Sequence, residues 1–142
     1  MPRISYVIGR LDRVVRSAIA TVIRDQGLSV GQYTVLSVLG HRGSLSNAQL
    51  ARRSYVSPQS MNEVLLNLEN HGYVTREDDP HHGRIRRTVL TSKGRTALAA
   101  CDALVAEVET EMTASLSIDD RTVLQHLMIE CVHGLHGGLP QL

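Results

Sequence analysis

The chain has 142 residues, of which 42% are hydrophobic and only 3% aromatic, so a single aliphatic core fits helix packing better than a β-sandwich. No apolar run approaches the roughly 18 residues of a membrane span, and the N-terminus does not resemble a signal peptide, which predicts a soluble, cytoplasmic protein. The formal net charge of +1 is unevenly distributed: residues 41–99 carry nine Lys and Arg against five Asp and Glu, whereas residues 100–142 carry one Arg against seven acids. Of these two regions, the first is suited to meet a polyanion and the second is not.

Two helices are predicted at the start of the chain. Apolar residues spaced by three and four, the pattern of one helical stripe, run from Ile4 to Val22. Ser29 is a suitable N-cap for a second helix that extends to about Leu39, where Gly40 is expected to end it.

Two shorter helices and a β-hairpin are predicted next. The first of these helices begins at Ser46 and the second at Ser57-Pro58, with a tight turn around residues 55 and 56 between them. Runs rich in Val, Ile, Thr and Tyr at residues 73–77 and 84–91 form the strands, joined by the turn Asp-Asp-Pro-His-His-Gly. Two adjacent helices followed by a hairpin indicate a winged helix-turn-helix.

Two further helices complete the expected fold. Thr91 caps one that extends to about Leu116, and Ser117 forms a capping box with Asp120 at the start of the last. The first and last helices have apolar seams without a partner in the winged-helix unit, so they are expected to pack against each other and against a second copy of the chain. The sequence thus predicts one mainly α-helical domain, with a winged helix-turn-helix unit at residues 28–96 and N- and C-terminal dimerisation helices at residues 1–26 and 97–142.

The helix at residues 57–71 has a polar face that suits base reading in DNA. Asn and Gln can pair with adenine N6 and N7, and Ser can bind a phosphate or a base edge. The candidate base-reading residues are Ser57, Gln59, Ser60, Asn62 and Glu63. The alternative is the ordinary solvated face of an amphipathic helix.

The hairpin and the first of the two short helices supply positive charge. Arg on a hairpin tip can enter an A·T-rich minor groove, and other Arg or Lys side chains can neutralise phosphates. The candidates for contacts to the DNA backbone or minor groove are Arg52, Arg53, His81, His82, Arg84, Arg86 and Arg87, with Arg76 and Lys93 as further phosphate contacts. The alternative is that charges on an exposed hairpin only prevent aggregation through its edges.

These segments resemble the MarR family of bacterial regulators. The similarity runs through LSVGQYTVL, SNAQLARRSYVSPQSMNEVLLNLENHGYVTRE and DDPHHGRIRRTVLTSKG, about half of the chain. Its most specific part is a wing pattern, Asp-Pro-x-Asp-x-Arg and then Leu-Thr-x-x-Gly, which this chain matches at Asp79, Pro80, Arg84, Leu90, Thr91 and Gly94. The resemblance implies a homodimer that places the helix at residues 57–71 in the major groove and Arg84 in the minor groove.

Two features depart from the family pattern. His82 stands where a second wing Asp is usual, so a carboxylate that would orient Arg84 is missing, and the wing is expected to be looser or sensitive to pH near the His pKa of about 6.5. The helix at residues 57–71 contains no Lys or Arg, so affinity for DNA has to come from the basic residues outside it.

The resemblance also implies a small-molecule effector. Family members often respond to small phenolic or aromatic acids bound between the dimerisation helices and the DNA-binding unit. By this resemblance Arg10, Arg13 and Tyr33 lie where such an anion could be held, since Arg can bind a carboxylate through two hydrogen bonds. The alternative is that Arg10 and Arg13 are solvated charges beside a dimer seam.

The sequence predicts no enzyme, cofactor or metal. It contains no P-loop, nucleotide-binding glycine pattern, HExxH or GxSxG. His126, Glu130 and His133 share one helical face, but no second ligand cluster joins them, so an exposed polar stripe is the preferred interpretation. We therefore expect a sequence-specific transcription regulator, more often a repressor, that binds a pseudo-palindromic operator as a homodimer. The alternative is a winged-helix module that binds protein rather than DNA.

Overall fold

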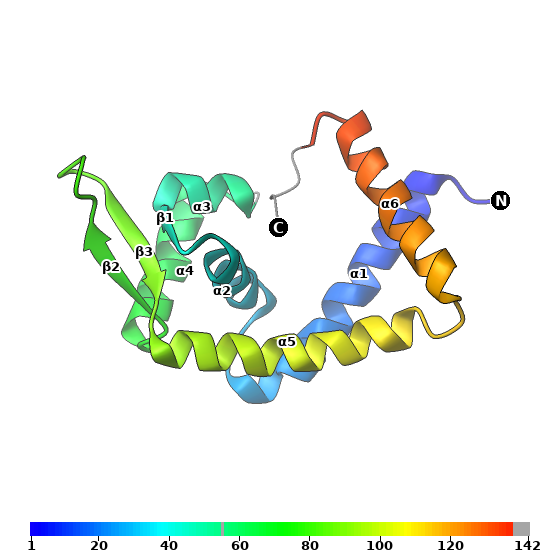
Figure 1. Ribbon diagram of the computed structural model, residues 1–142, viewed down its shortest axis with the longest axis horizontal. Helices are drawn as coiled ribbons and strands as arrows, with labels where there is room; N and C mark the ends of the chain where they lie inside the picture. Colours follow the sequence, from blue (N-terminus) through cyan, green and yellow to red (C-terminus); the bar gives the residue numbers. More distant parts are fainter. Residues whose placement is uncertain (55, 138–142) are drawn as a thin grey trace.

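The computed structural model describes residues 1–54 and 56–137, so Tyr55, in the turn predicted between the two short helices, lies outside the described residues. In chain order the elements are α1 (Ile4–Ile23), the 3-10 helix η1 (Arg24–Gln26), α2 (Val30–Arg42), β1 (Ser44–Ser46), α3 (Asn47–Arg53), α4 (Pro58–Asn70), β2 (Val74–Asp78), β3 (Arg86–Leu90), α5 (Ser92–Met112) and α6 (Ile118–Gly134). The long helix α5 joins a winged-helix lobe, made of α2, α3, α4 and the three strands, to a helical arm made of α1 and α6 (Figure 1). The predicted mainly α-helical winged helix-turn-helix with long flanking helices is confirmed.

Short polar side chains begin most of the helices. The hydroxyl groups of Ser29, Ser46, Ser57, Thr91 and Ser117 each accept a hydrogen bond from the backbone N–H of the third residue in the helix that follows. Each bond satisfies an N–H group that has no partner inside its own helix. Each of these helix starts was predicted from the sequence and is confirmed.

Two of the predicted helix ends are wrong. Helix α2 passes through Gly40 and ends at Arg42, where Gly43 adopts a φ of +80° as C-cap. A Cβ atom on Gly40 would lie 2.5 Å from Leu98 Cδ2, so this glycine lets α2 pack closely against α5 instead of ending the helix. Helix α5 ends at Met112 and not near Leu116.

The three strands form one antiparallel sheet in the order β1-β3-β2. Thr88 at the centre of β3 is paired with Leu45 on one side and with Arg76 on the other. Strand β1 was not predicted, because three residues are too short to show an alternating pattern. The sheet places the β2–β3 hairpin, the wing, beside α4 (Figure 1).

The hydrophobic core lies in the winged-helix lobe, the adjoining part of α5 and the C-terminal end of α1. Its largest fully buried apolar side chains are Ile23, Leu36, Leu39, Leu50, Met61, Leu65 and Leu68. Within the described part of the chain, α6 has no buried residue and α1 has only Ile23. None of the helices in residues 1–54 and 56–137 is long and apolar enough to cross a membrane.

A tight joint connects α4 and the wing to α5. The Thr91 hydroxyl donates to the Gly72 carbonyl oxygen at 2.6 Å, and the Lys93 ammonium donates to the carbonyl oxygen of His71 at 2.6 Å. A Cβ atom on Gly94 would lie only 2.0 Å from the Tyr73 carbonyl oxygen, so the first turn of α5 sits directly against the loop that follows α4. These contacts make α4, the wing and the start of α5 one packed unit.

Candidate nucleic-acid interface

Helix α4 has one buried face and one open face. Met61, Leu65 and Leu68 are at most 1% exposed and fix the helix on the core. The open face carries, at spacings of three and four residues, Gln59, Glu63, Leu66 and Asn70. Leu66 is 46% exposed, although it is an apolar residue in the middle of this face. Leu66 was not predicted as a DNA contact, because polar side chains are the usual sequence signal of base reading, yet an apolar side chain can contact the methyl group of thymine.

The predicted base-reading residues differ in exposure and in whether their side chains are already hydrogen-bonded within the protein. Ser57 accepts the Ser60 N–H at 3.1 Å and donates its own hydroxyl hydrogen to Ser60 Oγ at 3.0 Å, so these two hydroxyls are bonded to each other. Asn62 is half-buried, and its Oδ1 accepts a hydrogen bond from Arg76 at 3.3 Å. Gln59 and Glu63 are exposed on the open face.

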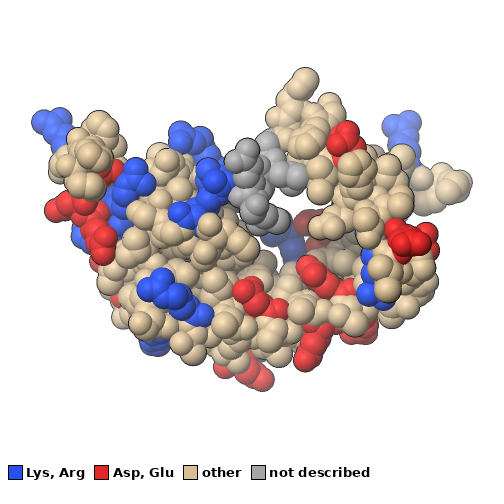
Figure 2. Space-filling model, in the orientation of Figure 1, with Lys and Arg blue, Asp and Glu red and all other residues tan. Residues whose placement is uncertain are grey.

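Positive charge lies next to this face. Arg52 and Arg53 occupy the last turn of α3, where Arg52 is exposed and Arg53 is half-buried. Figure 2 shows Lys and Arg side chains over the part of the winged-helix lobe that holds α3 and the wing, and several Asp and Glu side chains along α5. The charge asymmetry of the sequence is therefore also an asymmetry in space.

Two cations that were expected to contact phosphates are engaged inside the fold. The Arg76 side chain is 13% exposed, and its Nε lies 3.3 Å from Glu69 Oε2. Lys93 donates to the carbonyl oxygen of His71 and lies 4.7 Å from the centre of the Tyr73 ring. Both side chains hold α4 in place, a use that depends on tertiary partners and that sequence patterns do not reveal.

The wing is braced by a buried carboxylate. Asp79 is 5% exposed, and its carboxylate accepts hydrogen bonds from Arg87 Nε at 2.5 Å and from the His81 N–H at 2.8 Å. The hydrogen bond from Arg87 is the main cause that lowers the pKa of the Asp79 carboxyl below its ordinary value. Arg87 also donates to the carbonyl oxygen of Ser44 at 3.3 Å, which ties the wing to β1.

The wing tip presents the remaining predicted contacts. His81, His82 and Arg84 are all exposed there. The Asp79 N–H donates to the Ile85 carbonyl oxygen at 2.8 Å, and the Ile85 N–H donates to the His82 carbonyl oxygen at 2.9 Å, so backbone hydrogen bonds close the turn. The tip is thus ordered by its backbone and by Asp79, although His82 supplies no carboxylate. Greater looseness or pH sensitivity of this wing stays a prediction.

Arg86 lies lower on the wing, in β3. Its Nε is 3.8 Å from the exposed Asp78 carboxylate, and its Nη2 donates to the Arg76 carbonyl oxygen at 3.1 Å. The Arg86 side chain is 54% exposed, so it is still open to a polyanion.

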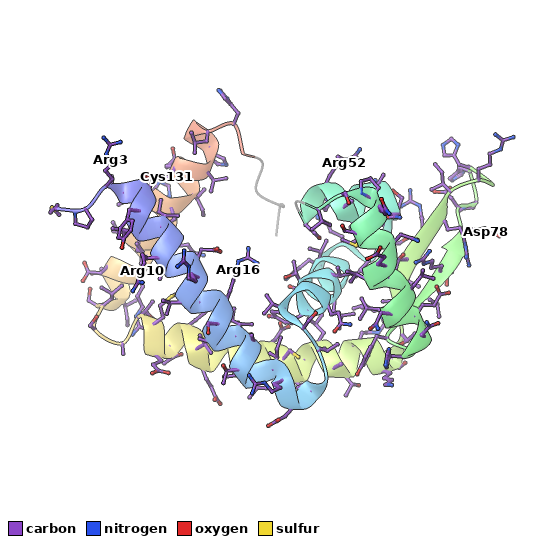
Figure 3. All side chains as sticks on the ribbon, turned by 180° about the vertical axis from the view of Figure 1, so that it is seen from behind. Arg3, Arg10, Arg16, Arg52, Asp78 and Cys131 are labelled. Carbon is purple, nitrogen blue, oxygen red and sulfur yellow. The ribbon has the colours of Figure 1, made fainter. Side chains whose placement is uncertain are left out.

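The three predicted effector-binding residues are not joined to one another. Arg10 and Arg13 are exposed on α1, and no hydrogen bond connects either of them to Tyr33 within residues 1–54 and 56–137. The Tyr33 hydroxyl donates to Asp102 Oδ1 on α5 at 2.7 Å, and partial burial together with this carboxylate raises the pKa of Tyr33. Figure 3 shows Arg10 on the part of α1 near α6, whereas Arg16 points towards the winged-helix lobe.

The polar stripe on α6 forms one weak contact. Nδ1 of His133 lies 3.7 Å from Oε1 of Glu130, and both side chains are exposed. Within the described ranges of the chain, no group of three or more His, Cys, Asp or Glu side chains is arranged to hold a metal ion.

The fold and the open face of α4 define a winged helix-turn-helix protein, and its sequence and fold are similar to those of one family of such proteins. The profile of the MarR family matches residues 26–85. The HTH-type transcriptional repressor Rv2887 of Mycobacterium tuberculosis is 29% identical over 125 residues, which cover 88% of this chain and 90% of the repressor. The crystal structure of Rv2887 in complex with DNA has a TM-score of 0.78 at 26% identity and covers 92% of this chain and 98% of that chain. The structure of Rv2887 with salicylic acid has a TM-score of 0.75 at 27% identity, over 92% and 97% of the two chains. The chain is thus similar to the MarR family in sequence over residues 26–85 and to a MarR family structure in fold over 92% of its length.

Proposed function

We propose that the protein is a sequence-specific DNA-binding transcription regulator that acts as a repressor. The observation that carries this proposal is the open face of α4, which stands between the arginines of α3 and those of the wing. Two properties of the relative Rv2887 support it, because that protein is a transcriptional repressor, not an enzyme, and has been solved with DNA. A regulator of this kind acts in the cytoplasm, where bacterial DNA lies.

In this proposal the winged-helix unit at residues 28–96 binds DNA through α4 and the wing. Helix α4 enters the major groove, where the exposed Gln59 and Glu63 meet base edges. Ser57 and Ser60 lie at the N-terminus of α4, where backbone N–H groups and hydroxyls suit a phosphate or a base edge. Arg84 at the wing tip enters the minor groove.

Affinity in this proposal comes from outside α4. The helix carries no Lys or Arg, and Glu63 on its open face repels phosphates. The side chains that offset this repulsion are Arg52, Arg53, His81, His82, Arg84 and Arg86. Arg87 contributes mainly by holding the wing in shape, because two of its nitrogen atoms are bonded to Asp79 and Ser44. We therefore expect binding that weakens strongly as salt rises.

The proposed homodimer forms through residues 1–26 and 97–142. The large apolar side chains that the arm exposes include Ile4, Val7, Ile8, Ile118, Leu124, Leu127 and Met128. A patch of this kind, with no described residue of α6 buried, is typical of a surface that a second copy covers. Two copies related by a two-fold axis match a pseudo-palindromic operator with half-site centres one helical turn, about 34 Å, apart.

A small phenolic or aromatic acid is the proposed effector. The support for it is the structure of Rv2887 with salicylic acid. Arg10 and Arg13 offer guanidinium groups for a carboxylate, and Tyr33 offers a phenol that is neutral at physiological pH, since its pKa is raised above an ordinary value of about 10. Asp102, which holds the Tyr33 hydroxyl, disfavours an anion immediately beside it. We expect the ligand carboxylate to lie towards α1.

Selection of bound sequences from a random duplex pool tests this function. The expected result is an inverted repeat with half-sites one helical turn apart, retained at low salt and released as ionic strength rises. Gln59→Ala should keep salt-dependent binding but lose discrimination at one position of each half-site. Indifference to duplex DNA at low salt would contradict the proposal and favour the alternative of a protein-binding module.

A further inference from the structure

Arg76 is buried between β2 and α4, and the DNA-binding role proposed above does not use it. Its side chain is 13% exposed, and its Nε lies 3.3 Å from Glu69 Oε2 in the last turn of α4. Its Nη1 donates to Asn62 Oδ1, 3.3 Å away, in the second turn. A side chain from the wing strand thus contacts both halves of α4.

The chemistry of this contact fixes the orientation of the Asn62 amide. A guanidinium has five N–H donors and no acceptor, so the amide atom that faces Arg76 has to be the oxygen. The NH2 group of Asn62 is attached to the same planar carbon and therefore points away from Arg76. Nε of Arg76 lies 3.3 Å from Glu69 Oε2, so these two side chains form an ion pair, although Nε and Nη2 have no hydrogen-bond partner within the described residues.

Asn62 lies at the edge of the open face of α4. It is half-buried and sits one helical turn from both Gln59 and Leu66. A side chain at this place reaches base edges when α4 lies in the major groove. Because its oxygen is bonded to Arg76, Asn62 approaches the bases as a hydrogen-bond donor.

We propose that Arg76 is a positioning residue that makes Asn62 read DNA as a donor, an inference that rests on the DNA-binding function proposed above. In the major groove guanine offers O6 and N7, thymine O4 and adenine N7 as acceptors, whereas the edge of cytosine offers only its N4 donor. Asn62 therefore selects against cytosine and favours guanine, which has two adjacent acceptors. This differs from the paired contact to adenine that is expected of an unconstrained Asn.

Selection from a random duplex pool with Asn62 variants tests the reading of this position. The wild type should show one position in each half-site where cytosine is depleted about tenfold relative to guanine. In Asn62→Asp one carboxylate oxygen still accepts from Arg76 and the other presents an acceptor, so the same position should change to favour cytosine. Asn62→Ala should lose selection there. An unchanged preference in Asn62→Asp would overturn the proposal.

Substitutions of Arg76 test the positioning role itself. Arg76→Met retains an apolar stem but removes every donor, so depletion of cytosine should disappear and adenine should rise at the same position. Arg76→Lys keeps one donor for Asn62 and should restore part of the depletion. Full depletion of cytosine in a folded Arg76→Met protein would contradict the role of the guanidinium.

Asn67→Ala is the matched control, because Asn67 is on the same helix but its Oδ1 accepts from Gln32 Nε2 of α2 at 2.6 Å. It should leave the selected motif unchanged. Thermal unfolding shows whether the Arg76→Met protein is folded. If it is not folded, the base preference of the Asn62→Asp protein decides whether Asn62 reads DNA as a donor. A wild-type protein that enriches no sequence contradicts the DNA-binding function, whereas an enriched motif that Asn62→Asp leaves unaltered contradicts only the role of Arg76.

Discussion

The winged-helix lobe and the helical arm differ in how completely each buries its own apolar side chains. In the lobe Leu36, Leu50 and Leu68 have no exposed surface. In the arm no described residue of α6 is buried, and Leu127 is 56% exposed. Most of the stability of a protein helix comes from tertiary packing of its apolar face, and α6 has no such packing within the described residues. The lobe therefore has a core of its own, whereas the arm depends on a surface from outside the chain.

The largest expected effect comes from placing a charge on the arm. Leu127→Glu should convert the dimer to a monomer, because the carboxylate would be buried without a partner in the interface. Affinity for an operator with two half-sites should then fall by about a hundredfold or more, since the half-sites no longer bind as a pair. Sedimentation velocity and titration of the operator measure the two effects.

Ile85→Glu is the control for this substitution, because Ile85 is also exposed, at 42%, but lies on the wing. It should remain a dimer. A dimeric Leu127→Glu protein would show that α6 does not form the interface and would remove the contrast between the two regions.

Truncating one leucine in each region compares how much each region contributes to the stability of a single chain. Leu36→Ala should reduce the free energy of unfolding by about 2–5 kcal/mol, because it leaves a cavity in a closed core. Leu127→Ala should cost much less at protein concentrations low enough to give monomers. Urea unfolding over a range of protein concentrations separates the two. Equal losses in the dilute protein would mean that the arm is packed within one chain.

The two regions should also differ in their contribution to salt dependence. Arg52→Ala should lower the slope of log Kobs against log salt by roughly 0.9 for each phosphate contact that is lost. Arg3→Ala, which removes an exposed arginine just before α1, should leave the slope unchanged. Titrations of the operator at several salt concentrations give both slopes. Equal slopes for Arg52→Ala and the wild type would exclude Arg52 from the DNA contact.

The smallest expected effect concerns the wing. The folded protein lowers the pKa of Asp79, so the stability from its ion pair with Arg87 is complete above the ordinary Asp pKa of about 3.9 and is lost as pH falls through the lowered value. Asp79→Asn should therefore increase amide exchange in the wing at neutral pH, and the difference from the wild type should disappear in acid. Asp78→Asn is the control, because the Asp78 carboxylate is 82% exposed and 3.8 Å from Arg86. If both variants exchange alike at neutral pH, Asp79 does not brace the wing.

Features that depend on neighbouring residues were predicted from the sequence, and features that depend on distant partners were not. The caps at Ser29 and Ser57 act within one turn, so the residue types alone identify them. Gly40 has the sequence properties of a helix end, but its role is set by Leu98, far along the chain. Strand β1 exists because its residues pair with β3.

The candidate site follows the same rule. The polar face of α4 and the basic wing were predicted, because helical spacing and charge are local properties. The sequence could not show that Arg76 faces inward to Glu69, or that Asn62 is bonded through its oxygen. These contacts join α4 to a strand of the wing, and they determine which atoms are presented outward.

Because α5 is packed tightly at Gly94, a rotation of this helix at the arm also moves the winged-helix lobe. With 21 residues at 1.5 Å each, the helix is about 30 Å long, so a tilt of about 10° at its arm end displaces the other end by about 5 Å. Thr91, Lys93 and Gly94 pack the first turn of α5 tightly against the loop that follows α4. Helix α4 and the wing therefore move together with the N-terminal end of α5. Since successive base pairs in DNA are about 3.4 Å apart, this displacement exceeds one base-pair step. The length of one helix thus amplifies a small change of angle in the arm into a change of register on the DNA.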